Sequence, residues 1–279
     1  MQYRLATRAD IPRLRDLMNA QYARKKTDAY FHWQYFDSAW PTRVVVTDID
    51  GQAMGMFGMQ ARRLADGTRV GQAIDLLLDP TLRGTGAFAA MGARVLAELP
   101  DLQAVCVLPN LNGRNAVARA LQWDVLGKLD ALEWPTDRPL GQSADPQPLA
   151  PARAQFAWTP SELQWRFDAH PDYRYTWHGP VLTKLFQDPV TGRRFGDLVL
   201  VQGSQMAIRA AALALATEGV ERVTTWALPH TAMWQALRDL GFQPVAQERY
   251  FCVRVLDPAV AHLADWRAWA LQPADAEFF

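Results

Sequence analysis

The pattern of apolar and polar positions predicts an α/β chain that begins with a strand and a capped helix. Residues 2–6 alternate as a short strand does. Thr7 and Asp10 then form a capping-box pattern ahead of apolar residues at helical spacing. Residues 29–37 are mostly aromatic and fit neither period, so their structure stays open.

Strands and helices alternate through the rest of the first half. Asp50-Gly51 lies between two strand-like runs, which is a strong hairpin signal. A second turn at Asp66-Gly67 leads into another strand. A helix, a buried strand, a helix and an extended segment are predicted over residues 87–100, 101–109, 112–121 and 124–134.

The composition changes over residues 135–160, where six prolines lie among Gly, Ser and Gln, and this predicts an interdomain linker. A regular pattern resumes after it. We expect a strand pair that turns near Thr191-Gly192, an alanine-rich helix with Gly219 as its C-cap, a strand, a helix, and a last strand or strand pair.

The two halves of the chain resemble each other. HWQYFDSAWP around Trp33 is similar to LQWRFDAHP around Trp165, and VCVLPNLNGRNAVARALQW is similar to TTWALPHTAMWQALRDLGF. The predicted elements also follow in the same order. The sequence therefore predicts two copies of one α/β unit, with domains over residues 1–134 and 161–279.

Charge and composition narrow the classes of function. Lys+Arg and Asp+Glu both number 29, and without a basic excess we expect no nucleic-acid partner. No apolar run approaches the roughly 20 residues that span a bilayer. The first residues lack the apolar core of a signal peptide, so we expect a cytoplasmic protein. Cys106 and Cys252 lie in apolar strand-like runs, which favours buried free thiols over a disulfide.

Two glycines, Gly84 and Gly86, stand at the start of the predicted helix that follows AIDLLL. A helix N-terminus offers unpaired backbone N–H groups and the positive end of the helix dipole. Glycines there let a diphosphate approach those donors closely, and Arg83 adds a positive charge. The alternative is a glycine-rich turn that only packs a helix on a sheet. The stretch is neither a Walker A loop nor a G-x-G-x-x-G motif.

In this context, RGTGAF at residues 83–88 resembles the Arg/Gln-x-x-Gly-x-Gly/Ala motif of the GNAT superfamily of acyl-CoA-dependent N-acyltransferases, with Phe88 where that family usually has Gly or Ala. LPNLNGRNAVARALQWDVLG is similar to a subgroup with Pro-Asn-x-Asn after the fifth strand. The resemblance covers residues 1 to about 134 and continues as a tandem copy without the glycine motif. It implies two GNAT-like units, each a mixed central sheet flanked by helices. The second unit would be degenerate, and would either support the first or complete an acceptor cleft.

The resemblance also implies acetyl-CoA or another acyl-CoA as co-substrate. Its contacts would come from the end of the fourth strand, from the glycine loop and from the segment after the fifth strand: Leu76, Leu77, Leu78, Arg83, Gly84, Thr85, Gly86, Ala87, Phe88, Asn110 and Asn112. The two asparagines equally suit a helix cap. Val117 stands near the place of the tyrosine that many family members use for the leaving thiolate, and a thiol with a pKa of about 8.5 can leave without an acid.

Asp75 is the candidate general base, because a lone carboxylate before three leucines of a buried strand is desolvated, and desolvation raises its pKa. It could equally cap a turn or pair with Arg62 or Arg63. His32 and Tyr35 are candidate acceptor-binding residues or simply part of the core. The histidines and cysteines show no ligand spacing, so we expect no metal.

We therefore expect an N-acyltransferase that moves an acetyl or other short acyl group from acyl-CoA to the amine of a small molecule or an amino sugar. A protein-lysine acetyltransferase is the alternative within the enzymes, and a strongly acidic surface groove would favour it. A non-catalytic CoA-binding or scaffolding protein of the same fold is the alternative from another class.

Overall fold

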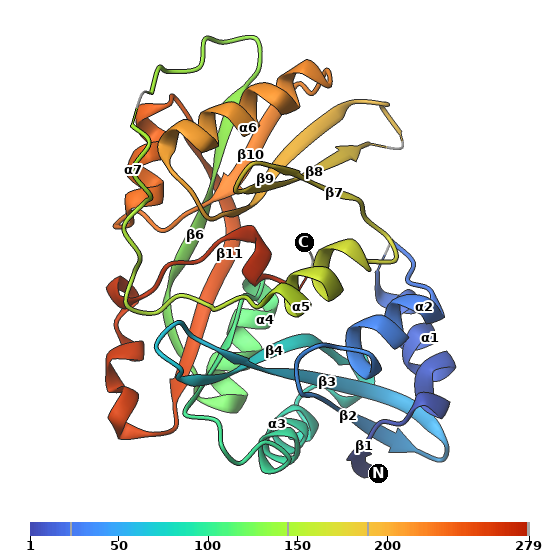
Figure 1. Ribbon diagram of the computed structural model, residues 1–279. Helices are drawn as coiled ribbons and strands as arrows, with labels where there is room; N and C mark the ends of the chain where they lie inside the picture. The colour runs from blue at the N-terminus through green and yellow to red at the C-terminus, as the bar shows by residue number, and fades with distance from the viewer. Residues whose placement is uncertain (23, 144, 189, 278–279) are drawn as a thin grey trace. The chain divides into compact units, whose positions relative to one another are not determined.

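The computed structural model describes residues 1–22, 24–143, 145–188 and 190–277, and it divides into two compact units (Figure 1). Unit 1 comprises Met1–Leu126, Ala157–Asp172 and Tyr250–Ala264. Unit 2 comprises Gly127–Phe156, Tyr173–Arg249 and the residues from Asp265 onward. Each unit thus draws on both halves of the chain, whereas the sequence predicted domains over 1–134 and 161–279. Ala144, within the expected linker, lies outside the described residues.

The sheet of unit 1 is mixed. Its neighbouring strands are antiparallel except for β4 and β5, which run parallel. In sheet order the strands are β1 (Gln2–Leu5), β2 (Thr42–Ile49), β3 (Gln52–Arg63), β4 (Arg69–Leu78), β5 (Ala104–Val107) and the last part of β11 (Gln243–Val255).

Helices cover both faces of this sheet. Successive strand residues point to opposite faces, so the apolar residues of one strand pack with helices on both sides. On one face Val44 and Val46 pack with α1 (Ile11–Gln21), α2 (Asp28–Phe31) and a π-helical turn over His32–Phe36. On the other face Val45 packs with α3 (Ala87–Ala97) and with a π-helical turn, Val117–Leu121, that continues α4 (Leu111–Ala116).

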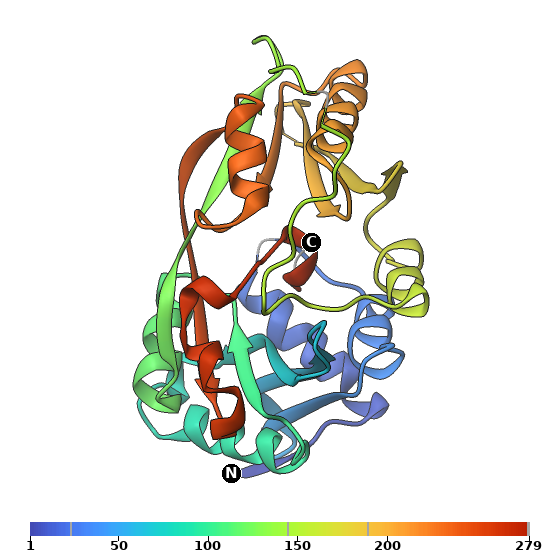
Figure 2. The same ribbon diagram turned by 60° about the vertical axis from the view of Figure 1, so that its left-hand side comes forward.

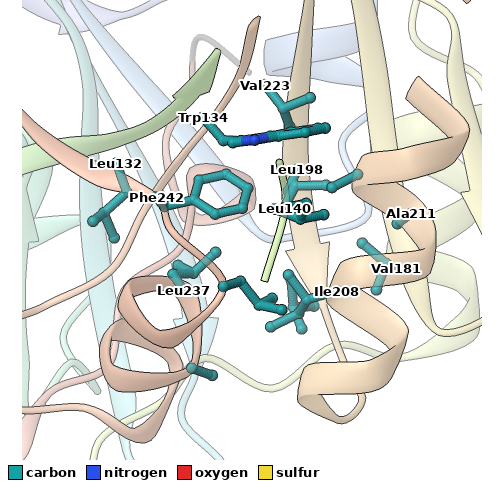
Figure 3. Close-up of a cluster of buried hydrophobic side chains, with 14 of the residues drawn as sticks. Leu132, Trp134, Leu140, Val181, Leu198, Ile208, Ala211, Val223, Leu237 and Phe242 are labelled. Atoms are coloured by element: carbon teal, nitrogen blue, oxygen red, sulfur yellow. The ribbon is translucent and has the colours of Figure 1, made fainter. Parts of the chain in front are cut away.

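Unit 2 has its own mixed sheet and core. In sheet order its strands are β6 (Asp124–Pro135), β10 (Arg222–Trp226), β9 (Arg194–Val201), β8 (Val181–Gln187) and β7 (Tyr175–His178). Helices α6 (Gln205–Thr217) and α7 (Ala232–Asp239) contribute apolar side chains to the core. Figure 3 shows that core, in which Trp134 and Phe242 lie with ring centroids 6.3 Å apart.

The two sheets share one topology, which confirms the predicted repeat. Read as β2-β3-β4-β5-β11 and β7-β8-β9-β10-β6, each has two antiparallel pairings, one parallel pairing and a final antiparallel one. In each case the last strand comes from the other half of the sequence. Cys252 of β11 pairs with Val107 of β5, and Leu132 of β6 pairs with Thr225 of β10. Figure 2 shows β6 in yellow-green and β11 in orange-red.

The aromatic segments of the two halves also match. Like residues 28–36, α5 (Pro160–Leu163) continues into a π-helical turn, Gln164–Asp168. Trp33 and Trp165 donate their indole N–H groups to each other's backbone carbonyls, at 2.8 and 3.1 Å, and their rings stack at 5.0 Å. Residues 29–37 fitted no regular pattern because the π-helical turn buries three consecutive side chains, from Trp33 to Tyr35.

Local signals were accurate where a few neighbouring residues decide the structure. Asp50 and Gly51 form the predicted turn with φ of 51° and 79°, and Gly219 follows α6 with φ of 73°. Asp10 accepts a hydrogen bond from the Thr7 N–H at 2.8 Å, as in a capping box. Both cysteine side chains are buried thiols. None of the helices in the described residues is long and apolar enough to cross a membrane.

Candidate functional site

A β-bulge interrupts β4 at Asp75. Gly58 of β3 pairs with Ile74 and Met56 pairs with Leu77, so two residues of β4, Asp75 and Leu76, lie opposite a single residue of β3. The extra residue brings Ile74 and Leu77 into the same core cluster, although unbroken alternation would place them on opposite faces. Asp75 itself has φ of 47°. That conformation is uncommon for any residue but glycine, although Asp tolerates it better than most.

The bulge lies beside an opening in the sheet. Strands β4 and β5 pair only over Val70–Gln72 and Ala104–Cys106. Beyond this point β4 continues to Leu78, whereas β5 ends at Val107. The backbone of β4 on either side of the bulge therefore has no β5 partner over its last six residues.

The glycine loop follows β4 directly. Gly84 and Gly86 have φ of 80° and 84°, and a Cβ atom added at either would meet nothing within 4 Å. Their backbone conformation requires glycine, and the space beside them is open. Asp79 orders the start of the loop by accepting hydrogen bonds from the Thr81 N–H at 2.9 Å and the Thr81 hydroxyl at 2.6 Å. Gly86 directly precedes the first turn of α3, and Arg83 is exposed earlier in the loop, just after the 3-10 turn Pro80–Leu82.

Phe88 does not fill this loop. Its ring packs against Phe57, with centroids 5.6 Å apart, and the partly buried side chain lies against the core cluster that includes Phe57 and Met91. A large side chain at this position therefore turns inward from the first turn of the helix. Ala87 is fully buried beside it.

The segment after β5 has a clear structural role. The Asn110 side-chain oxygen accepts a hydrogen bond from the Gly113 N–H at 2.9 Å and caps α4. Asn112 is exposed on the first turn of the same helix. Val117, at the position where the resemblance implied a tyrosine, is fully buried in the core.

Asp75 and Tyr35 are brought together, as a shared site requires. The Tyr35 hydroxyl donates a hydrogen bond to Asp75 Oδ2 at 2.5 Å. Desolvation raises the pKa of Asp75 above its ordinary value, and the Tyr35 hydrogen bond and the charges of Lys26 and Arg166 oppose that rise. Tyr35 itself is buried.

The alternative arginine partners of Asp75 are engaged elsewhere. Arg62 donates to the Gln72 side chain at 2.9 Å and stacks over Trp40, with its guanidinium carbon 4.3 Å from the ring centroid. Arg63 is exposed at the end of β3. The candidate base is therefore not the acid of an ion pair with either residue.

Three charged residues that the sequence did not single out belong to this part of unit 1: the charges of Lys26 and Arg166 lower the pKa of Asp75, and Asp172 pairs with Lys26. Lys26 Nζ lies 3.3 Å from Asp172 Oδ2 and 3.7 Å from the centroid of the Tyr30 ring. Arg166 is buried, with its guanidinium carbon 5.2 Å from the Trp33 ring centroid. Lys26 and Asp172 are 146 positions apart, so no local pattern links them. Arg166 carried one signal, its place in the second copy of the aromatic segment.

His32 does not join this group. Its Nδ1 lies 2.8 Å from a guanidinium nitrogen of Arg8, and Arg8 also pairs with Asp37 at 2.6 Å. His32 therefore belongs to an exposed polar cluster at the end of the π-helical turn. Of the two acceptor-binding candidates, only Tyr35 contacts Asp75.

Among its described residues, unit 2 has no equivalent of the glycine loop. Residues 202–204 connect β9 to α6, whereas residues 79–86 connect β4 to α3. The Gln272 side chain occupies the end of β9, where its oxygen accepts from the Val201 N–H at 2.7 Å and its amide donates to the Val201 carbonyl at 3.3 Å. Among the described residues of the whole chain, no group of His, Cys, Asp or Glu side chains is arranged to hold a metal ion.

No family model and no curated protein matches the sequence. Solved structures do match the fold. A GCN5-related N-acetyltransferase from Kribbella flavida has a TM-score of 0.62 at 12% identity, covering 95% of this chain and 74% of that one. A glucosamine N-acetyltransferase region of a fungal multi-domain β-N-acetylglucosaminidase has a TM-score of 0.58 at 14% identity, covering 90% of this chain and 38% of that one.

A tandem GNAT protein from the clavulanic acid biosynthesis pathway matches over nearly its whole length. Its TM-score is 0.55 at 15% identity, covering 92% of this chain and 99% of that one. That match, the repeated sheet topology and the glycine loop at the start of α3 agree with one another. The chain therefore has the fold of the GNAT N-acetyltransferases, built from two tandem units.

Proposed function

We propose that the protein is an acyl-CoA-dependent N-acyltransferase whose reaction takes place in unit 1. One observation carries the proposal: Asp75, a desolvated carboxylate on a bulge of β4, stands on the same strand that leads into the open glycine loop. A base and a diphosphate-binding loop joined by one strand suit a thioester whose reacting end lies far from its phosphates. The fold neighbours support acyl transfer at a general level.

The end of β4, which pairs with β3 but has no β5 partner, suits the acyl group and the pantetheine arm. Backbone N–H groups of Leu76 to Leu78 would donate to the thioester carbonyl, and backbone donors of the glycine loop and the first turn of α3 would bind the diphosphate. The loop residues Arg83, Thr85, Ala87 and Phe88 and the capping residues Asn110 and Asn112 border that path. Only their backbone or exposed atoms are needed.

Asp75 would take the surplus proton of the acceptor amine. The amine nitrogen attacks the carbonyl carbon, the C–N bond forms, the C–S bond breaks and the coenzyme leaves as a thiolate, which takes up the proton that the new amide nitrogen loses. A carboxyl group with a raised pKa is a better base than an ordinary aspartate, because it holds the proton more strongly. The acceptor would be a small molecule or an amino sugar, a class represented among the fold neighbours by the glucosamine N-acetyltransferase region.

The coenzyme site is tested by Gly86→Glu. The new carboxylate would enter the open space beside the loop and repel the diphosphate, so acetyl-CoA binding measured by calorimetry should be lost. Gly67→Glu is a matched control, because Gly67 also has a positive φ, 90°, and open space around it, but lies in the β3–β4 turn. Binding that survives Gly86→Glu, or is lost equally in Gly67→Glu, would refute this site.

A turnover measurement distinguishes the enzyme from the alternative, a non-catalytic CoA-binding or scaffolding protein. Release of free thiol from acetyl-CoA should depend on an amine acceptor from a panel of small molecules and amino sugars. Acetyl-CoA binding without turnover on any amine would favour a scaffolding role. If acetyl-CoA does not bind at all, both readings are wrong.

A further inference from the structure

Unit 2 contains a cavity of about 470 Å³ at the end of β9. Its lining comes from the connection between β9 and α6, the start of α7, residues 148–152 and 155, and the segment from Arg267 to Gln272. All of these residues belong to unit 2. The volume lies within the range of roughly 300–1,000 Å³ that is usual for the sites of small ligands.

The repeated topology gives this cavity the place in unit 2 that the opening beside β4 has in unit 1. Strands β9 and β10 pair only over residues 195–197 and 222–224, and β9 continues to Val201. The Gln272 side chain already bonds to the N–H and the carbonyl of Val201, and residues 202–204 are too few to form a loop like residues 79–86. The cavity therefore suits a ligand smaller than the coenzyme.

Arg267 gives the cavity a positive charge. Among the described residues that line it, Arg267 is the one permanent charge, and none is a carboxylate. No described residue forms an ion pair or a hydrogen bond with its guanidinium group, since the nearby Asp265 accepts from the Arg267 backbone N–H instead, at 2.9 Å. The guanidinium donors are therefore available to a ligand.

Much of the remaining lining is apolar. Val201, Met233 and Leu271 contribute apolar side chains, and the residues from 148 to 152 are proline, leucine and alanine. Gln155 and Gln202 add neutral amide groups, and neither side chain bonds to another described residue. The lining thus combines one positive charge with apolar surface and a few neutral polar groups.

We propose that this cavity binds a small monocarboxylate with an apolar body, whose carboxylate group pairs with Arg267. A guanidinium group can donate two parallel hydrogen bonds to the two oxygens of a carboxylate, and such a pair is stronger than a neutral hydrogen bond. The apolar body would lie against Val201, Met233 and Leu271, where it is removed from water. The inference assigns unit 2 a ligand of its own and does not depend on acyl transfer in unit 1.

Other classes of ligand fit this lining less well. An amine or another cation would meet Arg267 without finding a carboxylate. A phosphate ester brings up to two negative charges, and the second would find no other arginine or lysine in the lining. His230 is already engaged, because its Nε2 lies 2.9 Å from the Trp269 carbonyl oxygen, which can only accept a hydrogen bond.

Three probes with the same apolar body test the class of ligand. The full chain would be titrated with hexanoate, hexanamide and hexyl phosphate, and binding followed by ligand-observed NMR. We expect hexanoate to bind at least about tenfold more tightly than hexanamide, as one charged hydrogen bond of ordinary strength gives. Equal affinity for hexanamide, tighter binding of hexyl phosphate, or no binding of hexanoate up to about 10 mM would overturn the inference.

Arg267→Met tests the assigned partner of the carboxylate. Arg267 is exposed, so the fold should persist, and the affinity for hexanoate should fall about tenfold, to that of hexanamide. Arg193→Met is the matched control, because Arg193 is another exposed arginine of unit 2 but pairs with Glu221 and does not line the cavity. Unchanged affinity in Arg267→Met, or an equal loss in both variants, would overturn the assignment.

Two further variants test the place of binding. Ala232→Phe adds a ring at a lining position on the first turn of α7 and keeps Arg267, so it should weaken the binding of hexanoate and hexanamide alike. Gly86→Glu changes the glycine loop of unit 1 and should leave the affinity for hexanoate as it is. Full affinity in Ala232→Phe with an unchanged Tm, or hexanoate binding lost in Gly86→Glu, would show that the carboxylate binds elsewhere.

Discussion

Asp75 combines two unfavourable features in one residue, a desolvated carboxylate and a positive φ of 47°. Its pKa is raised in the folded protein. Its contribution to stability is therefore present below the unfolded pKa of about 4 and is lost as pH rises through the folded value. Ionisation of this side chain therefore destabilises the fold. Strain of this kind is typical of functional positions.

Asp75→Asn should separate stability from activity. Asparagine tolerates the left-handed conformation and carries no charge, so the Tm at pH 7 should stay the same or rise. Turnover should fall by about 100-fold if the carboxylate is the general base. Differential scanning calorimetry and thiol release measure the two effects. A lower Tm would contradict the electrostatic argument, and unchanged turnover would remove Asp75 from the mechanism.

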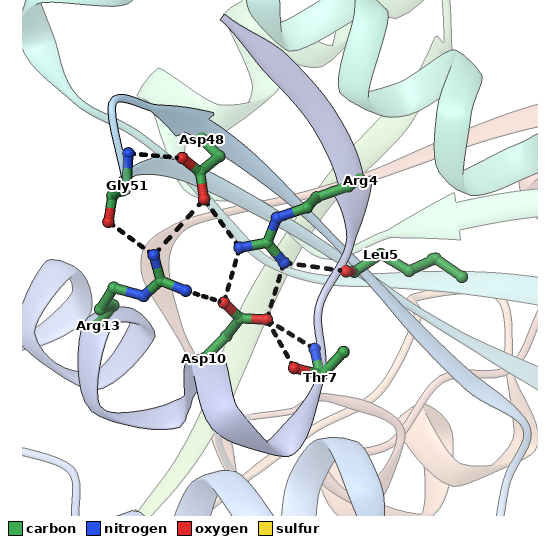
Figure 4. A network of polar contacts seen from close by, with 7 residues as sticks. All are labelled: Arg4, Leu5, Thr7, Asp10, Arg13, Asp48 and Gly51. Atoms are coloured by element: carbon green, nitrogen blue, oxygen red, sulfur yellow. Dashed lines mark hydrogen bonds and ion pairs between the residues drawn. The ribbon is translucent and has the colours of Figure 1, made fainter.

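Asp10 shows the opposite behaviour. Its buried carboxylate accepts from Arg4 at 2.7 Å and from Arg13 at 2.5 Å, and Asp48 completes the network (Figure 4). The Arg4 guanidinium holds the pKa of Asp10 well below its usual range. The resulting stabilisation is therefore present above the unfolded pKa of about 4 and is lost as pH falls toward the folded value.

Asp10→Asn should lower the free energy of unfolding by about 2–3 kcal/mol at pH 7, because the guanidinium groups of Arg4 and Arg13 lose one of their two carboxylate partners and keep only Asp48. Urea unfolding at pH 7 and at pH 3 measures the difference, and the gap between the two proteins should narrow at pH 3. Asp101→Asn breaks an exposed ion pair with Arg69 and should have no measurable effect. A gap that widens at low pH would contradict the assignment.

A site residue could be predicted from the sequence only where its immediate neighbours along the chain make it unusual. Asp75 and the two glycines stood out because their immediate context, a buried strand and a helix start, made them unusual. Lys26 and Asp172 did not, because their meeting depends on how two distant segments pack. Tyr35 could be named as a candidate but its partner could not, since the bulge that presents Asp75 to it leaves no mark in the alternation of β4.

At the scale of helices and strands, predictions from the sequence were accurate where the backbone is regular. Hairpins and amphipathic helices were predicted because their periods of two and 3.6 residues are expressed directly in the side chains. The π-helical turns at 32–36 and 164–168 were not, because a one-residue insertion in a helix destroys that period. Phe88 is explained only by the structure, as a partly buried side chain of α3 that packs against the core.

At the scale of the whole molecule, β6 and β11 each complete the sheet formed by the other half of the sequence. These two strands decide which parts of the chain can fold alone. Residues 1–134 alone lack the β11 residues that pair with β5, and residues 161–279 alone lack β6. Val105, Cys106 and Val107, all buried in the full chain, would then line an open sheet edge. A continuous pattern of strands and helices contains no sign of which sheet its last strand joins, so the sequence predicted two consecutive domains instead.

Fragments 1–134 and 161–279, expressed separately, should therefore not give a stable monomer. We expect neither to show the cooperative urea transition of the full chain, measured by circular dichroism, and we expect aggregates or larger species in analytical ultracentrifugation. A monomeric fragment with a sharp transition would show that its own last strand can close its sheet, and would contradict the exchange.

The exchange also bears on the history of the chain. Each copy of this repeat completes its sheet with a strand from the other copy, which is the arrangement of a strand-swapped homodimer within one chain. The copy without a glycine loop is therefore needed by the copy that has one, because its β11 closes the sheet that holds the loop. Selection on the chemistry of one half is then sufficient to preserve the other.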